Sequence, residues 1–150
     1  MYTYTRSKFI AADAQQCFDY LTDPSKMPAW DPNVIESKLV TPGPMVVGSK
    51  LQQVRKQGKK EMNCSADVIE HQPYSKHCVR TNIMGINATF AYSFEPENAG
   101  TQMSVRAELE GKGLAKLFEG FMGKMCEKVD NDIFDRIASA MSTSVRGEKA

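Results

Sequence analysis

The histidines and the acidic residues are the side chains in this sequence best suited to acid–base or metal chemistry. His71 and His77 flank a predicted hairpin turn, but the expected pairing puts His71 opposite Lys76, so we expect both histidines to be solvated. Helix capping and solvation account for the acidic residues near the predicted N-terminal helices, which are Asp13, Asp19, Asp23 and Asp31. The sequence contains no HExxH stretch, nucleophile elbow or glycine-rich phosphate loop. We therefore expect no metal and no cofactor, and the catalytic residues are left unassigned.

The four cysteines are spread along the chain without the short spacings of a zinc or redox site. They are Cys17, Cys64, Cys78 and Cys126. The segment MYTYTRSKFI has no basic region followed by an apolar core, so no secretory signal is predicted. We therefore expect reduced thiols and a cytoplasmic location.

Large apolar side chains recur at alternating positions in the second half of the chain and at helical spacing near its end. These residues are Phe90, Tyr92, Phe94, Met103 and Val105, followed by Phe118, Phe121, Met122 and Met125. They fill an ordinary core, for which methionine is well suited, or they line a cavity for a hydrophobic ligand. Both interpretations are open, and all nine are candidate ligand-binding residues.

Two polar side chains of one predicted strand could orient such a ligand. A two-residue turn at Gly58-Lys59 places Gln53 opposite Cys64 and turns Arg55 inward as well. A turn shifted by one residue would instead turn Val54 inward. The sequence leaves both registers open, and Gln53 and Arg55 are candidate ligand contacts.

Thr81 and Trp30 are further candidates, and Tyr92 could also orient a ligand. Thr81 and Tyr92 lie on the predicted inner face, although each hydroxyl could equally satisfy a neighbouring backbone group. Trp30 follows the short helices, where its amphipathic ring either packs in the core or borders an opening of the cavity.

Length and composition predict one globular domain that spans residues 1–150. The chain is 41% apolar and 25% charged, which is typical of a folded domain and excludes a disordered chain or a coiled coil. No apolar run approaches the roughly 20 residues of a membrane span. A net charge of +1 argues against a nucleic-acid partner. Both a monomer and a homodimer are compatible with the sequence.

One dense basic run, Arg55 to Lys60, lies at a predicted hairpin tip. Such a run is typical of a solvated surface that prevents edge pairing of strands. The less favoured alternative is an electrostatic contact with an anionic membrane or an acidic partner, which salt would screen.

The residue pattern predicts a strand and two short helices, and then a series of further strands. An opening strand, Tyr2 to Ile10, is followed by a helix from Ala14 to Leu21 and a short helix from Ser25 to Trp30. Six further strands are predicted at Val34–Val40, Val47–Gln57, Lys60–His71, Lys76–Met84, Asn87–Glu95 and Thr101–Glu110. The short connectors predict hairpins, and hence an antiparallel meander.

The strand pairing and the last helix together predict the fold. A turn at Gly85-Ile86 would place Ile83 opposite Ala88 and Thr81 opposite Phe90, with the apolar residues on one face. Apolar positions from Leu114 to Met141 recur every three or four residues, which predicts an amphipathic helix over 112–142 that covers this face. We therefore expect an α+β fold with a curved seven-stranded antiparallel sheet wrapped around a long C-terminal helix, and two short helices after the first strand.

This order of elements resembles the helix-grip fold of START-like lipid-binding domains and the birch-pollen-allergen group. Phe18 to Pro24, which reads Phe-x-x-Leu-x-Asp-Pro, followed by Trp30 resembles the opening of the polyketide cyclase/dehydrase-like branch, and Gly100-Thr101 matches the start of its last strand. The resemblance implies binding, or transport, of a hydrophobic molecule such as a lipid, polyketide or isoprenoid. An enzyme that cyclises or dehydrates a polyketide-like substrate is the alternative, and a partner-binding module with a filled core is a third.

Glycines near the start of the last helix predict uneven stability along it. Gly120 and Gly123 each weaken a helix by about 0.8–1 kcal/mol relative to alanine. Residues 111–125 are therefore expected to open more readily than the rest, as an adjustable wall of the site. Close packing of the backbone at the two glycines is the competing explanation.

Overall fold

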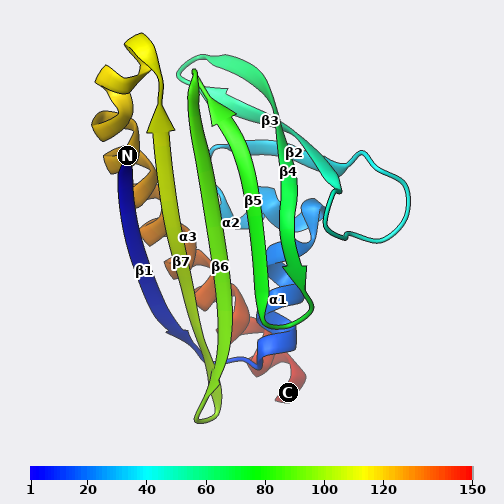
Figure 1. The fold of residues 1–150 in the computed structure, drawn as a ribbon. Helices are drawn as coiled ribbons and strands as arrows, with labels where there is room; N and C mark the ends of the chain where they lie inside the picture. Colours follow the sequence, from blue (N-terminus) through cyan, green and yellow to red (C-terminus); the bar gives the residue numbers. More distant parts are fainter. Residues whose placement is uncertain (150) are drawn as a thin grey trace.

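The computed structural model describes residues 1–149, without the side chains of Gln57 and of residues 142–149. Seven strands and a long final helix make up most of the chain (Figure 1). In chain order the elements are β1 (Tyr2–Ile10), α1 (Ala14–Thr22), η1 (Pro24–Lys26), α2 (Met27–Trp30), β2 (Val34–Leu39), β3 (Lys50–Gln57), β4 (Lys60–Gln72), β5 (Lys76–Ile83), β6 (Ile86–Glu97), β7 (Gly100–Gly111), η2 (Gly113–Phe118) and α3 (Glu119–Lys149).

The strands form one antiparallel sheet in the order β1-β7-β6-β5-β4-β3-β2. Its curved face wraps around α3 (Figure 1). The short helix α2 packs against β2, whereas α1 packs against β6, β7 and α3. Asp13 begins α1 with a reciprocal cap, because its carboxylate accepts from the Gln16 backbone and the Gln16 side chain accepts from the Asp13 backbone. The predicted fold class is confirmed.

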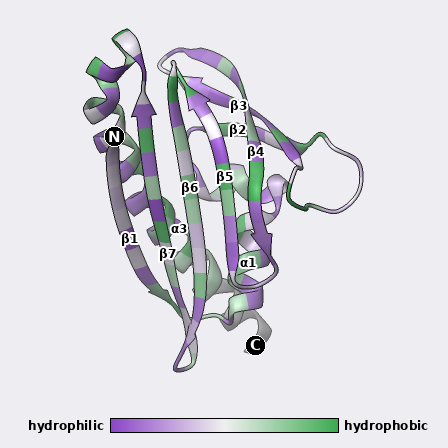
Figure 2. Cartoon of the chain, in the orientation of Figure 1, coloured by the Kyte–Doolittle hydropathy of each residue, from purple (hydrophilic) through white to green (hydrophobic). Residues whose placement is uncertain are grey.

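The core lies between the inner face of the sheet and α3. Alternate residues of β7 point inward and are fully buried, which Figure 2 shows as hydrophobic and hydrophilic bands along the strand. Ile133 and Ile137 of α3 complete this core from the other side. No helix among the described residues is both long and apolar enough to cross a membrane.

The turn between β5 and β6 differs from the prediction by one position. Its central residues are Met84 and Gly85, both with positive φ (53° and 86°), which matches the twist of a two-residue hairpin. Asn82 fixes the turn, since its Oδ1 accepts a hydrogen bond from the Gly85 backbone N–H at 2.9 Å. Ile83 therefore pairs with Ile86 and not with Ala88, and Thr81 pairs with Ala88 and not with Phe90. Every partner shifts by two, so the inward face is unchanged.

A register shift in β4 overturns the prediction for the two histidines. The irregularity between Val68 and Glu70 moves His71 opposite His77, where pairing with Lys76 was expected. The two Nδ1 atoms lie 3.1 Å apart, and His77 is only 4% exposed. Phe18 of α1 packs against both rings. The expectation of solvated turn histidines is therefore wrong for His77, which is buried, while His71 is half-buried. The shift and the α1 cover were not visible in the local pattern.

The C-terminal helix begins later than predicted. Residues 113–118 form the 3-10 helix η2, and α3 starts at Glu119. The Glu119 carboxylate holds the start of α3 in place. It accepts a hydrogen bond from the Gly111 backbone N–H at 3.0 Å and forms an ion pair with the Met1 ammonium at 2.6 Å. The tighter turns of η2 change the phase of the apolar stripe. As a result Phe118 and Phe121 are exposed, although they were expected to face the sheet.

Candidate functional site

A cavity of about 350 Å³ lies between the inner face of β3–β6 and the helices α2 and α3. Its size is at the lower end of the range for small-molecule sites. Most of its wall is apolar, with Val79 and Ile83 from β5 and Val129 and Ile133 from α3. The curvature of the sheet leaves this space because α3 packs most closely against β1, away from β3 and β4.

Eight of the predicted ligand-binding residues line this cavity. They are Trp30, Gln53, Arg55, Thr81, Phe90, Tyr92, Met122 and Met125. Phe90 and Tyr92 come from β6, and the two methionines come from the first turns of α3. The structure therefore brings together residues that lie almost a hundred positions apart in the chain.

The other five candidates lie elsewhere. Phe94, Met103 and Val105 are fully buried in the packed core beneath α1 and the middle of α3, and they do not reach the cavity. Phe118 and Phe121 are exposed and do not line the cavity. Inward orientation was predicted correctly for the first three, but orientation alone does not distinguish core from cavity wall.

Trp30 lines the cavity, and its indole carries a buried donor without a partner in the described part of the chain. Trp30 is 3% exposed at the end of α2. Its Nε1–H has no hydrogen-bond partner among the described residues. A buried donor left unpaired costs about 1–3 kcal/mol, so a ligand acceptor at this point would recover free energy.

An ion pair with a connected amide lies next to this donor. Asp31 is buried, and its Oδ2 lies 3.3 Å from Nη2 of Arg55 on β3. Arg55 also donates from Nη1 to Oε1 of Gln53 at 3.1 Å. Gln53 pairs with Cys64, so the register that turns Gln53 and Arg55 inward is confirmed. Capping and solvation were expected to explain Asp31, and this is incomplete. Its carboxylate accepts a hydrogen bond from the Asn33 backbone N–H, but it also forms the ion pair with Arg55.

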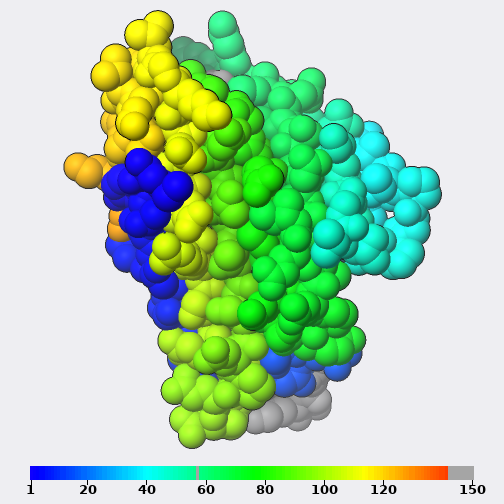
Figure 3. All heavy atoms as spheres, in the orientation of Figure 1, coloured from blue at the N-terminus to red at the C-terminus, as the bar shows by residue number. Residues whose placement is uncertain are grey.

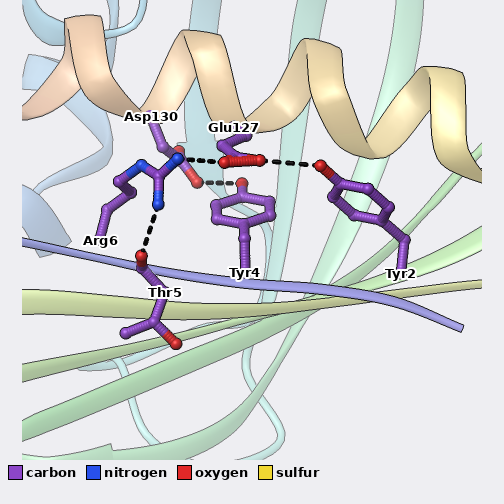
Figure 4. A network of polar contacts seen from close by, with 6 residues as sticks. All are labelled: Tyr2, Tyr4, Thr5, Arg6, Glu127 and Asp130. Carbon is purple, nitrogen blue, oxygen red and sulfur yellow. Dashed lines mark hydrogen bonds and ion pairs between the residues drawn. The ribbon is translucent and has the colours of Figure 1, made fainter.

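Asp130 adds a second buried carboxyl on the α3 side. The Tyr4 hydroxyl of β1 donates a hydrogen bond to Asp130 Oδ2 (Figure 4). Burial raises the pKa of Asp130 to about 6, while the Tyr4 hydrogen bond acts in the opposite direction. The sequence analysis missed this residue, although an acidic side chain between Cys126 and Ile133 on the apolar stripe of α3 was an available signal.

Glu127 of α3 belongs to a separate network with residues of β1. It accepts a hydrogen bond from the Tyr2 hydroxyl at 2.8 Å and forms an ion pair with Arg6 (Figure 4). These contacts fasten α3 to β1. Glu127 itself does not line the cavity, whereas Asp130 does.

The two predicted hydroxyls differ in their surroundings. Thr81 donates to the Ser65 backbone carbonyl at 2.8 Å, so its hydroxyl is already satisfied. Burial raises the pKa of Tyr92, and the nearby Asp130 and Asp31 act in the same direction. The Tyr92 hydroxyl therefore stays protonated, and Tyr92 lines the cavity, so this hydroxyl is a second donor at the site.

Within the described part of the chain, no cluster of three or more His, Cys, Asp or Glu residues is arranged to hold a metal ion. Burial raises the pKa of Cys126, which lines the cavity, to about 11. Its thiol is therefore protonated and a poor nucleophile near neutral pH.

A curved sheet gripping a helix around an apolar cavity defines a helix-grip protein. Residues 1–142 match the model of the family described as polyketide cyclase / dehydrase and lipid transport, and the chain belongs to this family. Among curated proteins, no sequence matches it.

Several solved structures share the fold at low sequence identity. Ara h 8.0201 superposes with a TM-score of 0.76 at 14% identity, over 95% of this chain and 98% of that one. SA2116, a protein of unknown function from Staphylococcus aureus, gives 0.77 at 13% identity, over 97% and 96%. The di-domain ARO/CYC BexL from the BE-7585A biosynthetic pathway gives 0.77 at 10% identity, over 93% of this chain but 46% of that one. At these identities the likeness concerns the fold.

Proposed function

We propose that this protein binds, and carries, a largely apolar small molecule in the cavity between the sheet and α3. A lipid, a polyketide or an isoprenoid is the kind of ligand we expect. The observation that carries the proposal is the mostly apolar cavity of about 350 Å³, whose wall includes Trp30 with its unpartnered Nε1–H. Such a site favours a hydrophobic body with one hydrogen-bond acceptor, which Trp30 and Tyr92 would hold.

Membership of a family whose description includes lipid transport supports this proposal. The open cavity counts against the alternative of a partner-binding module with a filled core. We also propose that residues 1–150 act as one domain, since all seven strands join one sheet and the main core includes residues of β1, β6, β7 and α3.

A tryptophan placed inside the cavity tests the site directly. Cys64 on β4 is half-buried and lines the cavity, so Cys64→Trp should occupy its volume. Ser65, its neighbour on the exposed face of the same strand, gives the matched control Ser65→Trp. In a fluorescence titration with a fatty-acid probe, we expect Cys64→Trp to weaken binding at least tenfold and Ser65→Trp to leave it unchanged. Equal binding by both folded variants would place the probe elsewhere and contradict the proposal.

A second candidate function is the cyclisation or dehydration of a polyketide-like substrate. Asp130 favours it, because a carboxyl with a pKa near 6 at the cavity wall can donate or accept a proton near neutral pH. Turnover of a polyketide-like substrate that disappears in Asp130→Asn would establish the enzyme. Tight binding of the same compounds without turnover would support the carrier.

A further inference from the structure

Large apolar side chains are exposed together at one end of the molecule. Leu114 is 81% exposed, Leu117 77% and Phe121 67%. We call this set the apolar rim, and it consists of Met84, Leu114, Leu117, Phe118, Phe121 and Met125. The β5–β6 turn packs against η2, since a Cβ at Gly85 would lie 3.3 Å from that of Ala115, so Met84 belongs to the same surface. Exposed apolar clusters of this kind mark interaction sites.

The apolar rim adjoins the opening of the cavity. Met84 and Met125 are exposed and also line the cavity, as do Lys56 and Gly58 of the β3–β4 hairpin. The hairpin tip and the yellow η2–α3 segment extend at the same end of the molecule in Figures 1 and 3. A surface that covers the apolar rim would therefore also cover the route into the cavity.

Exposed lysines surround the apolar rim on both sides. They are Lys56, Lys59 and Lys60 on the hairpin, and Lys112, Lys116 and Lys124 on η2 and α3. Among the side chains that the structure describes, none of these six lysines forms an ion pair. Of the acidic residues at this end, Glu119 is buried and already bound to the Met1 ammonium, which leaves Glu61 and Glu110 exposed. The charge around the apolar rim is therefore positive, although the whole chain is nearly neutral.

We propose that this end of the molecule docks reversibly on an anionic membrane surface. The apolar rim would enter the headgroup region, and the lysines would contact the lipid phosphates and carboxylates. Docking would bring the cavity opening against the acyl region, where an apolar ligand can pass without crossing water. The docking surface stands on its own observations and does not depend on which ligand the cavity takes.

The charge pattern favours a membrane over a second copy of the chain. A symmetric dimer through the apolar rim would place the same six lysines of two chains against each other, and like charges in contact are unfavourable. An anionic bilayer offers apolar and negative groups together. The combination of exposed aromatic or aliphatic residues with flanking lysines fits that partner.

Vesicle co-sedimentation tests the proposal. The full chain should bind vesicles of phosphatidylcholine with 30% phosphatidylserine, and should bind pure phosphatidylcholine at least tenfold more weakly. Leu117→Ser with Phe118→Ser should reduce binding at least tenfold. Val46→Ser with Val47→Ser is the matched control, because these valines are also more than half exposed but lie on a loop outside the apolar rim, and this variant should bind normally.

The electrostatic part has its own variants. Lys112→Gln and Lys116→Gln should each weaken binding about fivefold, while Lys38→Gln on β2 should not. Cys64→Trp should sediment with vesicles like the wild type, which separates docking from ligand uptake. Absence of binding to anionic vesicles, or equal binding to neutral ones, would overturn the proposal. The proposal would also be overturned if the free protein sediments as a dimer and the double variant Leu117→Ser with Phe118→Ser sediments as a monomer.

Discussion

Trp30 and Asp31 are neighbours in sequence with opposite roles in the cavity. The Asp31 carboxylate is paired with Arg55, whereas the Trp30 Nε1–H has no partner among the described residues. A paired buried group stabilises the fold or is neutral, while an unpaired one carries a cost that a ligand acceptor can remove. This contrast separates residues that hold the site together from a residue that is available to a ligand.

Trp30→Phe should separate ligand affinity from stability. The phenyl ring keeps most of the packing and removes the unpaired donor, so the free energy of unfolding should change by less than about 1 kcal/mol. Loss of one hydrogen bond to the ligand should weaken binding roughly fivefold to tenfold. Urea unfolding and ligand titration measure the two effects. A large loss of stability with unchanged affinity would make Trp30 a packing residue.

Two buried groups give the protein opposing responses to acid. Burial, with a contribution from His71, lowers the pKa of His77 from 6.5 to about 4. The native state then binds fewer protons at this site than the unfolded state, so stability falls as the pH drops through 6.5 towards 4. Burial raises the pKa of Asp130 from 3.8 to about 6, so the native state binds more protons there and stability rises over a similar range.

Variants at these two positions should separate the responses. Between pH 7 and pH 5, His77 should cost on the order of 2 kcal/mol and Asp130 should return roughly 1 kcal/mol. On acidification, the stability of His77→Gln should rise relative to that of the wild type at the same pH. The stability of Asp130→Asn should fall relative to that of the wild type. Urea midpoints at the two pH values measure this. Parallel pH profiles for all three proteins would contradict the assigned environments.

At the scale of elements, the start of α3 shows how local contacts override a periodic pattern. The spacing from Leu114 to Met141 predicted one continuous stripe, and from Met122 onward it holds except at Met125, which is exposed at the cavity. Before that point, the bonds of Glu119 to Gly111 and Met1 impose a 3-10 segment and rotate the side chains outward. Those bonds join residues far apart in sequence, so a periodicity argument could not include them.

The two glycines of this segment have different surroundings. A Cβ at Gly123 would lie 2.1 Å from the ring of Tyr2, whereas one at Gly120 would meet nothing within 4 Å. Close packing is therefore confirmed at Gly123 and absent at Gly120. This asymmetry means that one variant at each position is more informative than a combined variant.

Alanine substitutions should consequently have opposite signs. Gly120→Ala should stabilise the protein by about 0.5–1 kcal/mol through helix propensity. Gly123→Ala should destabilise it by roughly 1–3 kcal/mol, because the Tyr2 ring must move and its bond to Glu127 is disturbed. Thermal unfolding measures both. Amide exchange of residues 119–125 should slow in Gly120→Ala, and unchanged exchange would argue against an adjustable wall.

For the whole molecule, the sheet, the long helix and the inward face were predictable because they follow from alternation and helical spacing. The same patterns could not distinguish Phe94 and Met103, which fill the core, from Phe90, which borders the cavity. That difference depends on the distance between α3 and each strand, which is set by the curvature of the sheet. Asp130 was missed for a related reason, since its partner Tyr4 lies 126 positions away.

The central claim is that the cavity holds an apolar ligand, and mass spectrometry of an organic extract tests it most directly. We expect purified wild type and Ser65→Trp to release one predominant apolar compound at close to one equivalent per chain. Cys64→Trp, with its cavity filled, should release none above background. Empty extracts from all three proteins, together with no thermal stabilisation of the wild type by fatty acids, sterols or aromatic compounds, would contradict the account.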